Sequence, residues 1–134
     1  MRILGIDYGS KRVGLALGDT ESKIATPWAV LPNEGALALL GKIHDVVERD
    51  LVSEIVVGIP RPLKDSSLEN EQVREVRKFL AGLKGLNLPV HEEDEVLSSK
   101  LAARQVEDAG EKGKRDDLAA AAILQTWLDR NGAV

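Results

Sequence analysis

The alternation of apolar and polar positions at the start of the chain predicts a β-hairpin. Residues 2–7 form a mostly apolar run that ends in Asp7, which is the pattern of a strand buried on both faces. In residues 12–18, large apolar side chains alternate with glycine and alanine, so the large ones share one face of a strand. Gly9 and Ser10 lie between the two segments and favour a turn. We therefore expect two antiparallel strands, the first of which ends at a carboxylate.

The next part of the pattern predicts a third strand and then a helix. Residues 23–31 are typical of a strand, and Pro27 indicates an edge or irregular position because proline donates no hydrogen bond to a ladder. Residues 34–49 carry apolar residues at helical spacing, and Asn33 is a candidate N-cap. The remaining elements are a strand over residues 54–59, a helix after the possible capping box of Ser66 and Glu69, a strand over residues 88–92, and two helices over about residues 98–109 and 115–130.

This order of elements, β-β-β-α-β-α-β-α-α, predicts an α/β protein. A hairpin followed by β-α-β-α-β implies a mixed five-stranded sheet flanked by helices. The chain has 134 residues, enough for one domain with a sizeable core. We expect residues 1–134 to form a single domain, with Trp28 and Trp127 in its core.

Composition narrows the chemistry that such a domain can carry. The chain has no cysteine and only two histidines, which excludes disulfides and zinc-thiolate sites. Its net charge of −4 provides no overall positive field, so any site for a polyanion must be a local basic patch. No run is apolar and long enough for a leader or a membrane span, so we expect a cytoplasmic protein without a membrane partner.

Carboxylates follow the strands that are expected to be parallel. Asp7 ends the first strand, Glu92-Glu93-Asp94-Glu95 ends the last one, and Asp116 and Asp117 begin the last helix. The carboxyl ends of parallel strands meet at one edge of a sheet, where ligands gather. Both aspartates flank the apolar face of the helix by similar rotations, and the spacing alone does not choose between them.

Several carboxylates at one place would need a cation. Two of them about 5 Å apart repel by roughly 3 kcal/mol at an effective dielectric constant near 20. With no thiols and few imidazoles, a hard divalent ion such as Mg²⁺ or Mn²⁺ is the candidate. Two such ions can support phosphoryl transfer by activating a water and stabilising a leaving oxygen.

Each acidic group also has a simpler interpretation. Asp7 can accept backbone hydrogen bonds in a turn, residues 92–95 can be a solvated charge run, and Asp116 and Asp117 can stabilise a helix N-terminus. Their convergence at one expected edge favours the site. Basic residues in loops near that edge could contact phosphates, although charged loops are common: Lys11, Arg12, Arg61, Lys64, Lys112, Lys114 and Arg115.

Taken together, these segments resemble the YqgF-type family of Holliday junction resolvases and pre-16S rRNA nucleases, which have a ribonuclease-H-like fold. The resemblance covers essentially the whole chain. Its motifs are "ILGIDYGSKRVGLALGD" at residues 3–19, "EIVVGIP" at 54–60, "DEVLSS" at 94–99 and "KGKRDDLAAAAIL" at 112–124. Each motif alone is moderately specific, and the ordered set is strong.

The resemblance implies the roles of individual acids. It makes Asp7, Glu95 and Asp116 the catalytic residues, adds Asp94 as a neighbouring metal ligand, and selects Asp116 over Asp117. The implied cofactors are two Mg²⁺ or Mn²⁺ ions, and the implied reaction is hydrolysis of phosphodiester bonds in precursor rRNA or branched DNA. A homodimer is implied only for branched DNA, whose symmetry needs two active sites.

Departures from the family pattern leave other functions open. Val96 stands where the family usually has arginine, and the loop after Pro60 lacks the usual glycine after Asp65. One alternative is a non-catalytic interaction module in ribosome maturation or transcription that retains a relic acid cluster. A phosphotransferase of the actin and sugar-kinase class shares a motif like "GIDYGS", but it needs a second related domain that 134 residues do not supply.

Overall fold

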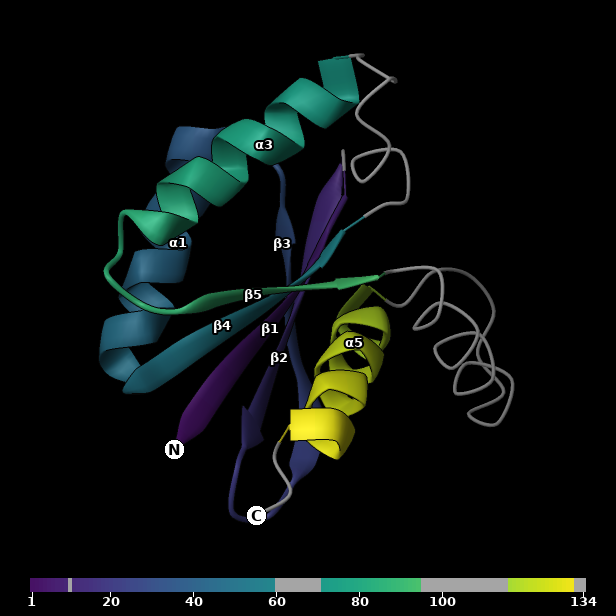
Figure 1. Ribbon diagram of the computed structural model, residues 1–134. Coiled ribbons are helices and arrows are strands. Elements are labelled where there is room, and N and C mark those ends of the chain that lie inside the picture. Colours follow the sequence, from purple (N-terminus) through teal and green to yellow (C-terminus); the bar gives the residue numbers. More distant parts are fainter. Residues whose placement is uncertain (10, 60–70, 95–115, 132–134) are drawn as a thin grey trace.

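The fold is built on a five-stranded mixed sheet, as the sequence predicts (Figure 1). The structure, a computed structural model, describes residues 1–9, 11–59, 71–94 and 116–131. The strand order is β3-β2-β1-β4-β5. The elements are β1 Arg2–Tyr8, β2 Arg12–Asp19, β3 Ile24–Pro32, α1 Ala36–Arg49, β4 Val52–Ile59, α3 Glu71–Lys84, β5 Val90–Asp94 and α5 Asp116–Asn131.

The central strand β1 joins an antiparallel half of the sheet to a parallel half. On one side β1 pairs antiparallel with β2, with Ile6 opposite Leu15. On the other side it pairs parallel with β4, with Ile6 opposite Val57. Strand β5 continues the parallel half beside β4. The carboxyl ends of β1, β4 and β5 therefore lie along one edge of the sheet, as expected for the candidate site.

One face of the sheet is covered by α1 and α3, which lie side by side in Figure 1. The core on this face consists of large apolar side chains, because alternate strand residues and one stripe of each helix point into it. Phe79 of α3 is fully buried, and its ring centroid lies 5.0 Å from that of Tyr8. The other large buried side chains here include Leu4, Ile6, Leu15, Leu39, Ile43, Ile55 and Leu83.

The opposite face is covered by α5 (Figure 1). The helix packs closely on glycine residues of the strands. A Cβ atom added at Gly5 would lie 2.8 Å from the Cβ of Leu124, and one at Gly58 would lie 2.3 Å from Cδ1 of Ile123. Distances this short do not occur between real side chains, so these glycines allow the helix its close approach. Ala120 and Ala121 on the helix are buried in the same cluster.

Strand β3 lies at an edge, which confirms the interpretation of Pro27. A register irregularity occurs in the β2–β3 ladder, where Leu15 faces Ala29 and Ala16 faces Pro27. Trp28 falls between these pairs and is 39% exposed, so the expectation of a core tryptophan is wrong at this position. Arg49 of α1 instead lies over its ring, 5.3 Å from the centroid.

The N-terminus of α1 differs from the expected cap. The helix begins after Gly35, whose φ of 108° favours glycine, and no side chain caps it. Asn33 accepts a hydrogen bond from the Gly35 amide at 3.1 Å and donates one to the Gly9 carbonyl at 2.8 Å. The amide of Asn33 also donates to the Lys11 carbonyl. Asn33 is therefore a bridge between two loops, because these partners compete with the helix end for its side chain.

Other expected elements are confirmed with shifted bounds. Strand β5 begins and ends two residues later than the predicted 88–92, because its pairing with β4 continues to Asp94 opposite Ile59. The expected helix over residues 98–109 and the capping box of Ser66 and Glu69 lie outside the described residues. Among the helices that the structure describes, none combines the length and apolarity needed to cross a membrane.

Candidate metal centre

Asp7 is a buried carboxylate at the carboxyl end of β1. Its side chain is 8% exposed. Along the strand, Ile3 and Gly5 contact the cluster under α5, whereas Tyr8 contacts Phe79 on the opposite face. Because side chains alternate along a strand, Asp7 faces the α5 side. An ionised carboxylate in such a place must be compensated by hydrogen bonds or cations, as the sequence indicated.

A second buried carboxylate occupies the same row of the sheet. Asp7 is opposite Gly58 on β4, and Gly58 is opposite Glu93 on β5. Residues paired across a sheet share a face, so Glu93 also faces the α5 side, about 10 Å from Asp7 by two strand spacings. The Glu93 side chain is only 4% exposed and forms an ion pair with Arg130 of α5.

Glu93 is not among the site residues predicted from the sequence. A run of four acids is typical of a solvated segment, and the shifted bounds of β5 are what place Glu93 inside the sheet. The sequence carried no signal for it, because the face of Glu93 follows from its pairing with Gly58 of β4, a register between distant segments.

The first turn of α5 lies near the level of Asp7. The Ala120 carbonyl and the Leu124 Cβ lie on the side of α5 that faces Gly5 of β1. Leu128, further along the helix, lies against Gly18 at the other end of the hairpin. The helix thus runs antiparallel to β1. Ala120 lies against Gly5. From Ala120 back to Asp116 the helix advances about 6 Å, and from Gly5 forward to Asp7 the strand advances about 6.7 Å in the same direction. The backbone of Asp116 therefore lies near the level of Asp7.

Two basic residues follow Asp7 in the turn between β1 and β2. Lys11 and Arg12 are both exposed there. The bridge formed by Asn33 ties this turn to the start of α1 through the carbonyl groups of Gly9 and Lys11. A close approach of Gly9 to the Arg12 carbonyl also shapes the turn, since an added Cβ would lie 2.4 Å from that oxygen. Two exposed basic residues therefore lie where the turn ends and β2 begins, within five residues of Asp7 in the sequence.

The other predicted site residues fall beyond what the structure describes. Asp94 and Asp116 lie in described backbone, at the end of β5 and the start of α5, but their carboxylates are not described. Five more predicted site residues lie outside the described residues: Glu95, Arg61, Lys64, Lys112 and Lys114. Their grouping around Asp7 stays a prediction.

The donor chemistry near Asp7 fits a hard divalent cation. Oxygen ligands suit Mg²⁺ and Mn²⁺, and the chain contains no thiol that would favour a softer metal. Among the described side chains, no three acidic or histidine groups lie close enough together to hold an ion. Any complete site would therefore combine Asp7 with acids whose carboxylates are not described.

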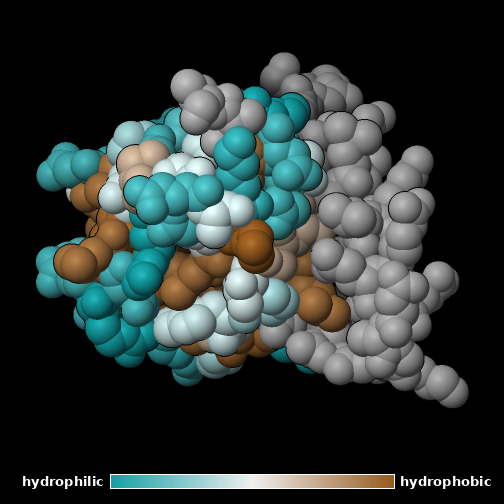
Figure 2. All heavy atoms as spheres, turned by 90° about the horizontal axis from the view of Figure 1, so that it is seen from below, coloured by the Kyte–Doolittle hydropathy of each residue, from teal (hydrophilic) through white to brown (hydrophobic). Residues whose placement is uncertain are grey.

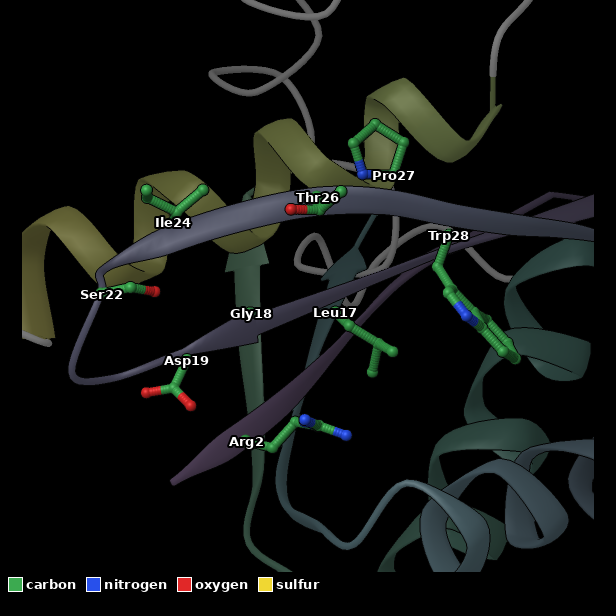
Figure 3. A pocket seen from close by; sticks show the side chains of 9 residues that line it. All are labelled: Arg2, Leu17, Gly18, Asp19, Ser22, Ile24, Thr26, Pro27 and Trp28. Atoms are coloured by element: carbon green, nitrogen blue, oxygen red, sulfur yellow. The ribbon is translucent and has the colours of Figure 1, made fainter.

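A hollow of about 460 Å³ lies at the opposite end of the sheet. In Figure 3, Arg2, Leu17, Asp19 and Trp28 extend to the side away from α5. The lower surface of the molecule there mixes apolar and hydrophilic groups (Figure 2). Arg2, which lines the hollow, is five residues from Asp7 on β1, about 17 Å along the strand. The Arg2 side chain also lies on the face of the sheet away from α5, whereas Asp7 faces α5, so the hollow takes no part in the candidate metal centre.

Solved structures confirm the fold. The crystal structure of the Fowlpox virus resolvase with a Holliday junction matches with a TM-score of 0.60 at 13% identity, covering 97% of this chain and 98% of that one. The structure titled "Thermus thermophilus RuvC structure" matches with a TM-score of 0.59 at 19% identity, covering 97% and 95%. These resolvases have the ribonuclease-H-like fold, as the sequence predicts.

Sequence relatives identify the family. A protein of Maridesulfovibrio salexigens named "Putative pre-16S rRNA nuclease" is 37% identical, covering 97% of this chain and 99% of the relative. A protein of the same name from Bacteroides thetaiotaomicron is 34% identical, covering 96% of each. The pattern of the family described as "RuvX: Holliday junction resolvase" matches residues 1–130. The chain therefore belongs to the RuvX family of Holliday junction resolvases, which confirms the YqgF-type resemblance.

Proposed function

We propose that this protein is a metal-dependent nuclease that hydrolyses phosphodiester bonds in nucleic acid. The observation that carries the proposal is the buried carboxylate of Asp7, which faces α5 at the edge where β1, β4 and β5 end. The backbone start of α5, with Asp116, lies near the same level. We propose that the acids at this edge together form a site of hard oxygen donors around Asp7.

The residues proposed to hold Mg²⁺ or Mn²⁺ are Asp7, Asp94, Glu95 and Asp116. When bound, two such ions supply Lewis-acid activation of water and stabilisation of the leaving oxygen. Asp7 is held rigidly, because both neighbouring strands pair with its backbone. A rigid ligand matters because small displacements of catalytic groups cost large factors in rate.

Basic residues in the surrounding loops are proposed to contact phosphates. Lys11 and Arg12 are exposed a few residues after Asp7. In the sequence, Arg61 and Lys64 follow β4, and Lys112 and Lys114 precede α5. Contacts to phosphates position a nucleic acid without reading its bases. We therefore expect recognition of shape and backbone rather than of sequence, and binding that weakens as salt is added.

Two substrates fit the names of similar proteins, and either one is consistent with the cytoplasmic location that we propose for this protein. Curated relatives are named for pre-16S rRNA, and a structural neighbour was solved with a Holliday junction. We propose precursor rRNA, trimmed at its 5′ end, or branched DNA as the substrate. Branched DNA would require a dimer with two active sites, whereas trimming of an RNA end would not.

The decisive experiment compares labelled substrates with and without the divalent ion. A four-way junction, duplex DNA, single strands and a structured precursor rRNA are incubated with Mg²⁺ or Mn²⁺. We expect Asp7→Asn to lower the cleavage rate by at least about a hundredfold, the scale of losing one transition-state stabilising group. Asp45→Asn serves as the matched control, because Asp45 is exposed on α1.

Each outcome of that experiment has a consequence. Cleavage by Asp7→Asn at the wild-type rate would exclude the proposed centre. If the wild-type protein cleaves nothing with either ion while circular dichroism shows it folded, the alternative of a non-catalytic interaction module in ribosome maturation is favoured. In that case Asp7→Asn should also leave cellular function intact.

A further inference from the structure

The last turns of α5 are attached to β5 by two specific contacts. Arg130 forms an ion pair with the buried carboxylate of Glu93. One turn earlier, the ring of Trp127 lies against that of His91, with centroids 4.8 Å apart and planes tilted by 33°. His91 in turn hydrogen-bonds Glu54 of β4 through Nε2 at 2.8 Å. These side chains form a chain of contacts from β4 through β5 to the C-terminal end of the helix.

The rest of the α5 contact surface sets glycines of the sheet against side chains of the helix. Gly5, Gly18 and Gly58 meet Leu124, Leu128 and Ile123, and Ala120 and Ala121 are buried in the same cluster. Glycine offers no side chain with which the helix can interlock, so these contacts allow close packing without directional bonds. The directional contacts at Trp127 and Arg130 are therefore well placed to fix how far the helix is rotated and displaced along its axis.

Because Glu93 is buried, its carboxylate depends on Arg130 staying in place as its partner. The carboxylate is 4% exposed, whereas the Arg130 side chain is 58% exposed. A buried carboxylate without a partner is strongly destabilising, because its charge has lost water. Movement of Arg130 away from Glu93 would thus be costly, so the ion pair restrains the helix end that carries Arg130.

We propose that Glu93 and Arg130 are positioning residues for the candidate metal centre. By fixing the C-terminal end of α5 on β5, the pair sets the placement of the helix and hence of Asp116 in its first turn relative to Asp7. Because a helix moves largely as a rigid body, a displacement at one end is transmitted to the other. This inference rests on the proposed nuclease function for its effect on rate, but not for its effect on structure.

The test replaces the pair without leaving a buried charge. The double variant Glu93→Gln with Arg130→Met keeps similar volumes, and neutral replacements of buried ion pairs are often tolerated. The matched control neutralises the exposed pair on the opposite helix layer, Lys42 with Glu34, whose Nζ and Oε1 atoms lie 3.2 Å apart. That control is Lys42→Met with Glu34→Gln.

Two measurements separate positioning from a merely structural role. We expect the double variant to lower kcat at least about tenfold with little change in KM, since a misplacement of about 1 Å can cost a hundredfold. The single variant Arg130→Lys, which keeps both charges of the pair, should retain most of the wild-type kcat. Spin labels on cysteines introduced at Asp45 of α1 and Ala119 of α5 should show a shifted or broader distance distribution; the chain has no native cysteine to interfere.

The outcomes distinguish this inference from the proposed function. A folded double variant with wild-type kcat and an unchanged distance distribution would overturn the positioning role. A lower kcat with an unchanged distribution would also overturn it, because the effect would then be electrostatic. A changed distribution in a protein that cleaves no substrate would support the attachment of α5 and count against the nuclease function alone.

Discussion

The two faces of the sheet are packed in opposite ways. Under α1 and α3, large side chains such as Phe79 and Ile43 fill the space between the layers. Under α5, glycine and alanine bring the helix backbone close to the strands. Both charged side chains that are buried in the described residues, Asp7 and Glu93, lie on the α5 face.

This difference in packing assigns different roles to the two faces of the sheet. Burial of large apolar side chains stabilises a fold in proportion to the area removed from water. A helix that lies close to a sheet buries less area for each residue, but it holds backbone and polar groups at fixed short distances. We infer that the face under α1 and α3 mainly provides stability, and that the face under α5 mainly provides geometry.

The largest expected effect comes from a cavity in the α1 and α3 face. Phe79→Ala should lower the free energy of unfolding by about 3–5 kcal/mol, because the side chain is fully buried and its contact with Tyr8 is lost. Urea denaturation measures the change. Leu37→Ala is the control, since Leu37 is 88% exposed, and it should change stability by no more than about 0.5 kcal/mol. Cleavage lost by folded Phe79→Ala protein would mean that the two faces are not separable.

An intermediate effect is expected from adding one methyl group under α5. Gly5→Ala should lower stability by about 1–3 kcal/mol, because the new Cβ meets the Leu124 Cβ and the Ala120 carbonyl. It should also reduce cleavage by the folded protein, because α5 must move away from the sheet. Gly41→Ala in α1 is the control: nothing lies within 4 Å, and stability should rise by about 0.5–1 kcal/mol. Equal stability of the two variants would contradict the close packing under α5.

The smallest expected effect concerns the loop beside Asp7. Asn33→Ala should cost about 1 kcal/mol, because its hydrogen bonds to the Gly9 carbonyl and the Gly35 amide are lost. Thermal unfolding measures this change, and Thr20→Ala, whose hydroxyl lies 3.4 Å from the Met1 carbonyl, should change less. If Asn33→Ala were neutral, the bridge between the two loops would have no energetic role.

The strands and their succession along the chain could be predicted from the sequence because their patterns are local. Residues 2–7 form a mostly apolar run and residues 12–18 alternate between large and small side chains, which predicts the hairpin. Pro27 indicated the edge position of β3. The bounds of β5 could not be predicted in this way. They depend on pairing with Ile59 of β4, a contact between distant segments that leaves no trace in the local pattern.

The candidate site was predictable only in part. The position of Asp7 follows from a buried strand that ends in a carboxylate, and the structure confirms that burial. Glu93 was part of the predicted acidic run of residues 92–95 but was not selected as a site residue, because the family resemblance pointed to Asp94 and Glu95. Asn33 was assigned to a helix cap because the sequence does not show that Gly9 would lie within reach of its amide. In both cases the deciding partner comes from a distant part of the chain.

The central place of β1 has a consequence for how the protein is made. Its partner β2 follows immediately in the sequence, but its parallel partner β4 is completed roughly 50 residues later, which at about 5–20 residues per second takes several seconds. During synthesis one edge of β1 therefore stays without its partner strand until Val52–Ile59 has been made. Two neighbouring nascent chains could exchange this segment, so crowded translation is the condition under which the protein is most exposed to misassembly.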